Sequence, residues 1–119
     1  MIEAEFAHDG EDSISIKLSQ PVVPYRLIAF NGFYASTAGG GYDLQGVSTT
    51  EGNTGDVITA CTEYSYPVEM AEPIPLYAYV KPAADGSGRA AVGTATNNCG
   101  TCLAVGTTQI LLKIERQTH

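Results

Sequence analysis

Apolar and polar residues alternate with a period of two along much of this chain. The clearest example is the segment 64–70, where tyrosine, valine and methionine alternate with serine, proline and glutamate. Such alternation is typical of a strand with one buried face. Because Pro67 has no backbone N–H to donate, we expect this strand to lie at a sheet edge or to carry a bulge.

Shorter stretches of the same pattern predict further strands. They cover residues 14–18, 26–30, 43–48, 57–61, 76–80, 89–93, 101–105 and 109–115. Thirteen glycines and six prolines interrupt the chain so often that long helices are excluded. The sequence therefore predicts an all-β domain of eight or nine short strands, arranged as a barrel or a sandwich.

Glycine-containing turn sequences separate these strands. Asn31-Gly32 fits a two-residue hairpin turn, because both residue types accept a positive φ. Residues 52–55 and 85–88 predict two further reversals, and the three glycines at 39–41 predict a flexible loop tip.

The first residues differ in composition from the rest. Residues 1–12 contain five Asp or Glu and no Lys or Arg, together with the apolar Met1, Ile2 and Phe6. Such an acidic segment is not expected to enter the core, whereas its apolar residues suit contact with a partner. We therefore expect residues 1–18 to form an N-terminal arm and first strand, and residues 19–119 a single β domain. An ordinary frayed terminus is the alternative.

The charge balance argues against two classes of partner. Six Lys or Arg against thirteen Asp or Glu give a net charge of −7 without a basic stripe, so we expect no nucleic-acid binding. The same charge opposes binding to an anionic membrane, and the apolar runs are too short to span one. The first residues lack the basic and apolar regions of a secretory signal, which predicts synthesis in the cytosol without export.

The C-x-x-C sequence at Cys99 and Cys102 has the spacing of a redox pair or of half a zinc site. A redox pair needs a helix N-terminus to lower the pKa of its first thiol, whereas the residues that follow predict a strand. Zinc needs two more ligands, and only Cys61, His8 and His119 remain as candidates. We expect free thiols, no metal and no cofactor.

Other catalytic signatures are missing too. The chain has no G-x-S-x-G elbow and no glycine-rich phosphate loop with its lysine. A carboxylate pair for glycoside chemistry stays open, because its members need only be close in space. The absence of Trp argues against a sugar-stacking platform. We expect no enzymatic activity.

Two tyrosines suggest an interface. Tyr77 and Tyr79 alternate with aliphatic residues in the predicted strand 76–80. If the aliphatic side faces the core, both tyrosines project outward as a possible subunit interface. The alternative places both tyrosines inside a closed barrel.

Glycine-centred turns and strands follow one another in a characteristic order over about residues 20–115 of the chain. The first half contains Leu27-Ile28-Ala29-Phe30-Asn31-Gly32, Gly46-Val47-Ser48, Thr49-Thr50-Glu51 and Gly55-Asp56-Val57-Ile58-Thr59. The second half contains Tyr66-Pro67-Val68-Glu69, Pro73-Ile74-Pro75, Asp85-Gly86-Ser87-Gly88-Arg89-Ala90, Gly93 and Thr108-Gln109-Ile110-Leu111-Leu112-Lys113-Ile114. This order resembles that of the head decoration (cement) proteins of tailed bacteriophages, including the lambda-type family.

The resemblance implies a compact β-tulip domain that trimerises at threefold positions of a capsid, with an N-terminal arm that contacts the major capsid protein. It implies no catalytic residues. The three cysteines, the glycines at 39–41 and the short acidic arm depart from the family pattern.

The leading hypothesis is a virion structural protein, made in the host cytoplasm, that binds the outer capsid surface as a homotrimer, bridges capsid subunits and stabilises the head. An extended apolar-polar segment can add a strand to a neighbour's sheet edge. The residues predicted to bind the capsid are Ile2, Phe6, Ile14, Ile16 and Leu18. A phage or bacterial surface module that binds a carbohydrate or a host protein is the alternative, followed by a small thiol enzyme using Cys99 and Cys102.

Overall fold

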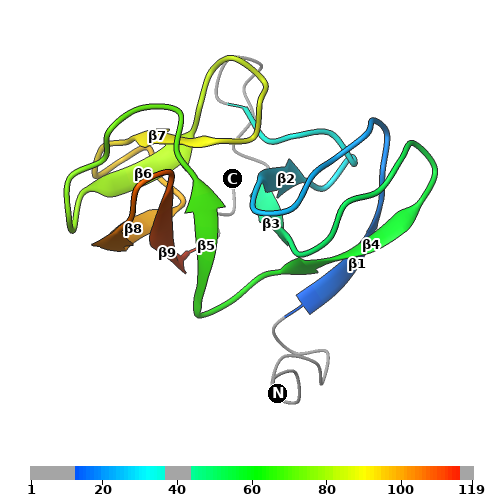
Figure 1. The fold of residues 1–119 in the computed structure, drawn as a ribbon, viewed down its shortest axis with the longest axis horizontal. Helices are drawn as coiled ribbons and strands as arrows, with labels where there is room; N and C mark the ends of the chain where they lie inside the picture. The colour runs from blue at the N-terminus through cyan, green and yellow to red at the C-terminus, as the bar shows by residue number, and fades with distance from the viewer. Residues whose placement is uncertain (1–12, 37–43, 116–119) are drawn as a thin grey trace.

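The computed structural model describes residues 13–36 and 44–115, which form nine strands and no helix (Figure 1). The strands are β1 (Ser13–Lys17), β2 (Leu27–Ala29), β3 (Leu44–Ser48), β4 (Val57–Cys61), β5 (Ser65–Glu69), β6 (Tyr79–Pro82), β7 (Ala90–Val92), β8 (Gly100–Val105) and β9 (Gln109–Ile114). The prediction of an all-β chain with eight or nine short strands is confirmed.

The strands form two antiparallel sheets. A four-stranded sheet has the order β1-β4-β3-β2, and a five-stranded sheet has the order β5-β9-β8-β6-β7. Because β5 is the first strand of its sheet, the edge position expected from Pro67 is confirmed. The predicted strand 76–80 is displaced, since β6 begins only at Tyr79.

The main core lies between the two sheets. Alternate residues of the five-stranded sheet, such as Val68, Val80 and Leu112, point inward and are fully buried. They share one cluster with Leu27 and Val47 of the four-stranded sheet. The apolar positions of the period-two pattern are therefore the residues on the two sheet faces that pack against each other.

A second, smaller core involves β1, β2 and β4 together with the segment that follows β1. Its buried members are Ile16, Leu18, Val22, Ile28, Ile58 and Ala60, with Ile14 and Tyr34 packed against them. β1 contributes because it pairs antiparallel with β4 in a register that places Ile16 opposite Ile58.

Arg26 connects the two sheets. From the segment before β2, its Nε donates to Oε1 of Glu69 on β5 at 2.8 Å, and its Nη2 lies 2.8 Å from the same oxygen. Its Nη1 donates to the carbonyl of Ser87 at 2.9 Å, and the guanidinium lies 5.6 Å from the centre of the Tyr34 ring. One cation therefore contacts both sheets and the turn between β6 and β7.

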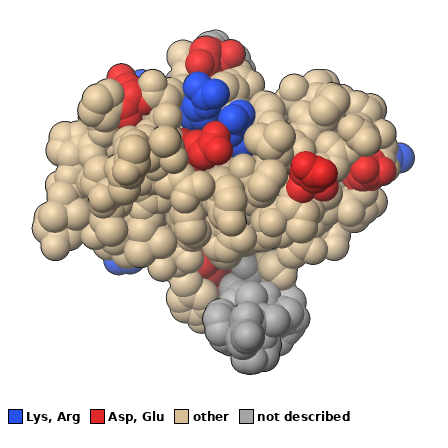
Figure 2. Space-filling model, viewed as in Figure 1, with Lys and Arg blue, Asp and Glu red and all other residues tan. Residues whose placement is uncertain are grey.

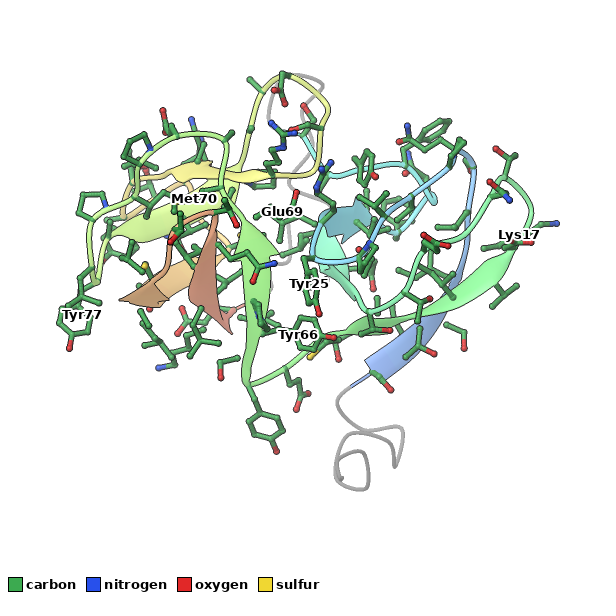
Figure 3. All side chains as sticks on the ribbon, in the orientation of Figure 1. Lys17, Tyr25, Tyr66, Glu69, Met70 and Tyr77 are labelled. Atoms are coloured by element: carbon green, nitrogen blue, oxygen red, sulfur yellow. The ribbon has the colours of Figure 1, made fainter. Side chains whose placement is uncertain are left out.

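Neighbouring contacts reinforce this connection. The rings of Tyr25 and Tyr66 stack with their centres 6.0 Å apart, and both lie between the sheets in Figure 3. The backbone N–H of Glu69 donates to the Tyr25 carbonyl at 3.0 Å. Burial is the main cause that raises the pKa of Tyr66, so its hydroxyl stays protonated at neutral pH.

The predicted turns are present where the structure describes the chain. The hairpin at Asn31-Gly32 is one residue longer than the predicted two-residue turn. The N–H of Ala29 donates to the carbonyl of Phe33 at 2.8 Å, so residues 30–32 form a three-residue loop in which only Gly32 has a positive φ, of +88°. A Cβ at Gly32 would overlap the carbonyl oxygen of Lys17, so glycine is required there. The predicted reversals at 52–55 and 85–88 also occur, whereas residues 39–41 lie outside the described residues.

Replacing Glu69 by Gln should lower the free energy of unfolding by about 1–2 kcal/mol, because the charge-assisted bonds to Arg26 become neutral ones. Urea unfolding measures this loss. Glu115→Gln is the matched control, because the Lys113–Glu115 pair is exposed and should contribute at most about 0.5 kcal/mol. Equal losses in the two variants would show that Arg26 does not tie the sheets together.

Candidate functional site

The thiols of the C-x-x-C sequence are buried. Cys99 lies just before β8 and Cys102 lies within it, and both are inaccessible to solvent. Burial raises the pKa of Cys99 to about 12, so this thiol stays protonated at neutral pH. The Cys102 thiol donates to the carbonyl of Ala104 at 3.3 Å. Such an environment opposes thiolate chemistry.

Cys61 is half-buried at the end of β4, and its thiol donates to the Glu63 carbonyl at 3.4 Å. Within residues 13–36 and 44–115, no group of three or more His, Cys, Asp or Glu is placed to hold a metal ion. His8 and His119, the other zinc candidates, lie outside the described residues. In the part of the chain that the structure describes, no helix could cross a membrane.

The predicted capsid-binding residues fall into two groups. Ile2 and Phe6 lie outside the described residues. Ile16 and Leu18 are buried in the second core, and Ile14 packs against it. The side chains that were predicted to bind the capsid therefore belong to the chain's own core. What β1 can still offer a partner is its backbone.

Three of the four sheet edges are protected. β5 carries Pro67, which has no N–H to offer. At β7, the N–H of Val92 donates to the carboxylate of Glu72 at 2.8 Å. β2 is covered by its own hairpin, because the N–H of Ala35 donates to the Leu27 carbonyl at 2.8 Å.

The remaining edge is that of β1. Near its end, the Asn31-Gly32 turn lies against it, and the N–H of Ser19 donates to the Gly32 carbonyl at 3.0 Å. Along Ser13–Ser15, no described strand pairs with the outer side. In an antiparallel edge strand, alternate residues direct their N–H and C=O groups outward. This stretch is therefore the place where an extended partner segment can add main-chain hydrogen bonds.

Exposed apolar side chains form further candidate contacts, and the sequence analysis missed one group of them. Phe30 and Phe33 flank the Gly32 turn, and Val57, which is 64% exposed, pairs with Lys17 beside that turn. The only sequence feature that could have indicated this exposed group is the presence of large apolar residues next to a glycine turn. In the view of Figure 2, uncharged residues cover most of the surface, and the charged groups are few and scattered.

The structure places Tyr77 and Tyr79 differently from the single strand that the sequence predicted. Tyr77 lies in the turn before β6 with a φ of +66°, and its N–H donates to the Cys102 carbonyl at 2.7 Å. Tyr79 is the first residue of β6. Leu76 is half exposed, so the expected alternation with a buried aliphatic face was wrong there. Both tyrosines are exposed, at 71% and 43%, which contradicts the alternative of two barrel-interior tyrosines.

Comparisons with known proteins bear on the fold. No protein-family model and no curated protein sequence matches the chain. Among solved structures, the chain is similar to the head fiber gp8.5 N base of bacteriophage phi29, with a TM-score of 0.63 and 15% sequence identity. The alignment covers 90% of this chain and 96% of that one. The two proteins share a fold. The resemblance to the lambda-type decoration family is not confirmed by these comparisons.

The burial of the thiols predicts their reactivity. At pH 8, iodoacetamide should modify Cys61 slowly and leave Cys99 and Cys102 unmodified, whereas all three should react in urea. Mass spectrometry of tryptic peptides identifies the modified residues. Rapid modification of Cys99 in the folded protein would contradict this environment and favour the thiol-enzyme alternative.

Proposed function

We propose that this chain is a structural protein of a bacteriophage virion that attaches to the outer surface of the capsid. The observation that carries the proposal is the fold shared with a phage head fiber base, which extends over nearly the whole of both chains. The buried thiols agree with a role without catalysis.

Attachment uses the N-terminal end of the chain. Residues 1–12 supply acidic groups together with Ile2 and Phe6, and they lead directly into the open edge at Ser13–Ser15. A segment of the major capsid protein adds to this edge by main-chain hydrogen bonds, while the apolar residues of 1–12 contact its surface. Because Ile16 and Leu18 stay in the core, binding does not require the domain to open.

The protein acts as a homotrimer at threefold positions. Three attachment segments on one assembly raise the avidity by roughly 10²–10⁴, because the second and third contacts form at an effective concentration of order millimolar. Contacts of this kind bridge neighbouring capsid subunits, so separating those subunits requires breaking several contacts together. The head is thereby stabilised against internal pressure.

A surface module that binds a carbohydrate or a host protein is the second candidate. The observation in its favour is the pair of strongly exposed tyrosines, Tyr64 and Tyr77, since aromatic rings stack on sugars and anchor protein contacts. Glycan binding by a protein that has no affinity for capsids would favour this candidate.

Deleting residues 1–12 should abolish or strongly reduce binding to capsids, because it removes the acidic and apolar contacts and leaves β1 intact. Co-sedimentation with mature capsids of the parent phage measures binding. Deleting residues 116–119 at the other end is the matched control and should leave binding unchanged. Full binding by the chain that lacks residues 1–12 would refute the attachment segment.

Raising the salt concentration from about 0.02 to 0.2 M should slow association with the capsid, because the Debye length shortens and the five acidic groups of residues 1–12 lose their long-range attraction to a basic patch. Stopped-flow or surface plasmon resonance measures the association rate. An association rate independent of salt would exclude steering by these acids.

A further inference from the structure

Three tyrosines adopt a backbone conformation that tyrosine rarely takes. In the described part of the chain, the non-glycine residues with positive φ are Tyr25, Tyr64 and Tyr77, at 68°, 66° and 66°. A side chain with a Cβ is strained in this left-handed region, where glycine or asparagine fits better. Such a residue persists only where the surrounding structure holds its backbone in that conformation.

Among the described residues, only one of the three rings stacks on another aromatic ring. Tyr25 stacks on Tyr66, and Figure 3 shows these two rings close to each other. Tyr64 and Tyr77 are 73% and 71% exposed, and among the described residues neither ring has a hydrogen bond or a ring contact. In Figure 3, the ring of Tyr77 points away from the body of the molecule. These two exposed rings are therefore available to a partner.

Backbone bonds hold both tyrosines in place at the ends of one sheet face. The carbonyl of Tyr64, next to β5, accepts from the N–H of Ile114, and the N–H of Tyr77, before β6, donates to Cys102, both at 2.7 Å. Between them, cross-strand pairs align Tyr79, Thr101, Lys113 and Ser65 in one row. We name as the outer strip the outward residues Ser65, Pro67, Tyr79, Thr101, Ala104, Leu111 and Lys113.

The charge of the outer strip indicates what can cover it. Its one charged residue, Lys113, lies 3.6 Å from the Glu115 carboxylate, so the strip is close to neutral. The whole chain carries −7, and two copies therefore repel each other except where a neutral surface faces the partner. A basic partner would instead prefer the acidic parts of the chain. These charges favour a second copy as the occupant.

We propose that the outer strip, with Tyr64 and Tyr77 at its two ends, is the surface through which copies of this chain associate. This inference rests on the trimer of the proposed function and assigns residues to it. In a closed ring, each copy meets its neighbours through two different surfaces. Two non-equivalent tyrosines suit that requirement, with the Tyr64 end of one copy against the Tyr77 end of the next.

The test uses variants that weaken the interface without unfolding the domain. Tyr64→Asn and Tyr77→Asn remove the rings and place there a residue that tolerates the left-handed conformation. In sedimentation velocity over a concentration series, each should raise the dissociation constant of the trimer at least about tenfold, as loss of an interface tyrosine does. The thermal midpoint measured at low protein concentration should stay unchanged or rise, because backbone strain is relieved.

Two controls separate association from folding. Val57→Asn replaces an apolar residue of similar exposure on the other sheet, and it should leave association unchanged. Tyr25→Asn removes the stacking with Tyr66, so it should lower the thermal midpoint and leave association unchanged.

The inference is overturned if the wild-type chain stays monomeric at about 1 mM, the effective concentration expected within an assembly. Trimers of wild-type strength from the Tyr64→Asn, Tyr77→Asn double variant would also overturn it. Co-sedimentation of wild-type protein with capsids is measured separately. If the protein binds capsids as a monomer, the proposed attachment stands and this interface is refuted. If it forms trimers but never binds capsids, this interface stands and the proposed attachment is refuted.

Discussion

The contact of Arg26 with Glu69 joins the segment before β2 to the edge strand of the other sheet. Arg26 lies before β2 and Glu69 lies at the end of β5, so a single guanidinium connects segments far apart in the chain, including the turn that contains Ser87. A charge in this partly buried position is tolerated only when each donor has an acceptor. The pairing therefore ties the edge strand β5 to the segment before β2, whereas the face that turns inward is the one that carries Val68, Val80 and Leu112. On the opposite face, Tyr79 and Lys113 stay exposed among the described residues.

The number and approximate positions of the strands could be predicted from local alternation alone, because burial of one sheet face leaves a period of two in the sequence. The pairings could not. β1 pairs with β4, and Ile16 and Ile58, which lie opposite each other, are more than forty residues apart in the chain. Nothing in the sequence of segment 14–18 indicates that Ile58 is the partner of Ile16. β6 was misplaced because Tyr77 takes a positive φ, a conformation that propensity assigns to glycine or asparagine.

The surfaces could be predicted only in part for a related reason. Alternation in residues 14–18 shows that one side is apolar but does not say whether the chain itself or a partner covers that side; here Ile16 and Leu18 are covered from within. The exposure of Tyr77 and Tyr79 was one of two alternatives that the sequence left open, and the turn that presents Tyr77 was not predicted. The open edge at Ser13–Ser15 is visible only when all four sheet edges are compared, which requires the topology.

The hydrogen bond from the N–H of Val92 to the carboxylate of Glu72 also affects how the sheet behaves at high protein concentration. A sheet with two unprotected edge strands can pair with the edges of further copies and grow into fibres. In the five-stranded sheet, Glu72 accepts a hydrogen bond from the edge strand β7, and Pro67 leaves the other edge strand, β5, without one of its donors. Both features oppose the addition of further strands to this sheet. Glu72 thus serves as a gatekeeper against polymerisation.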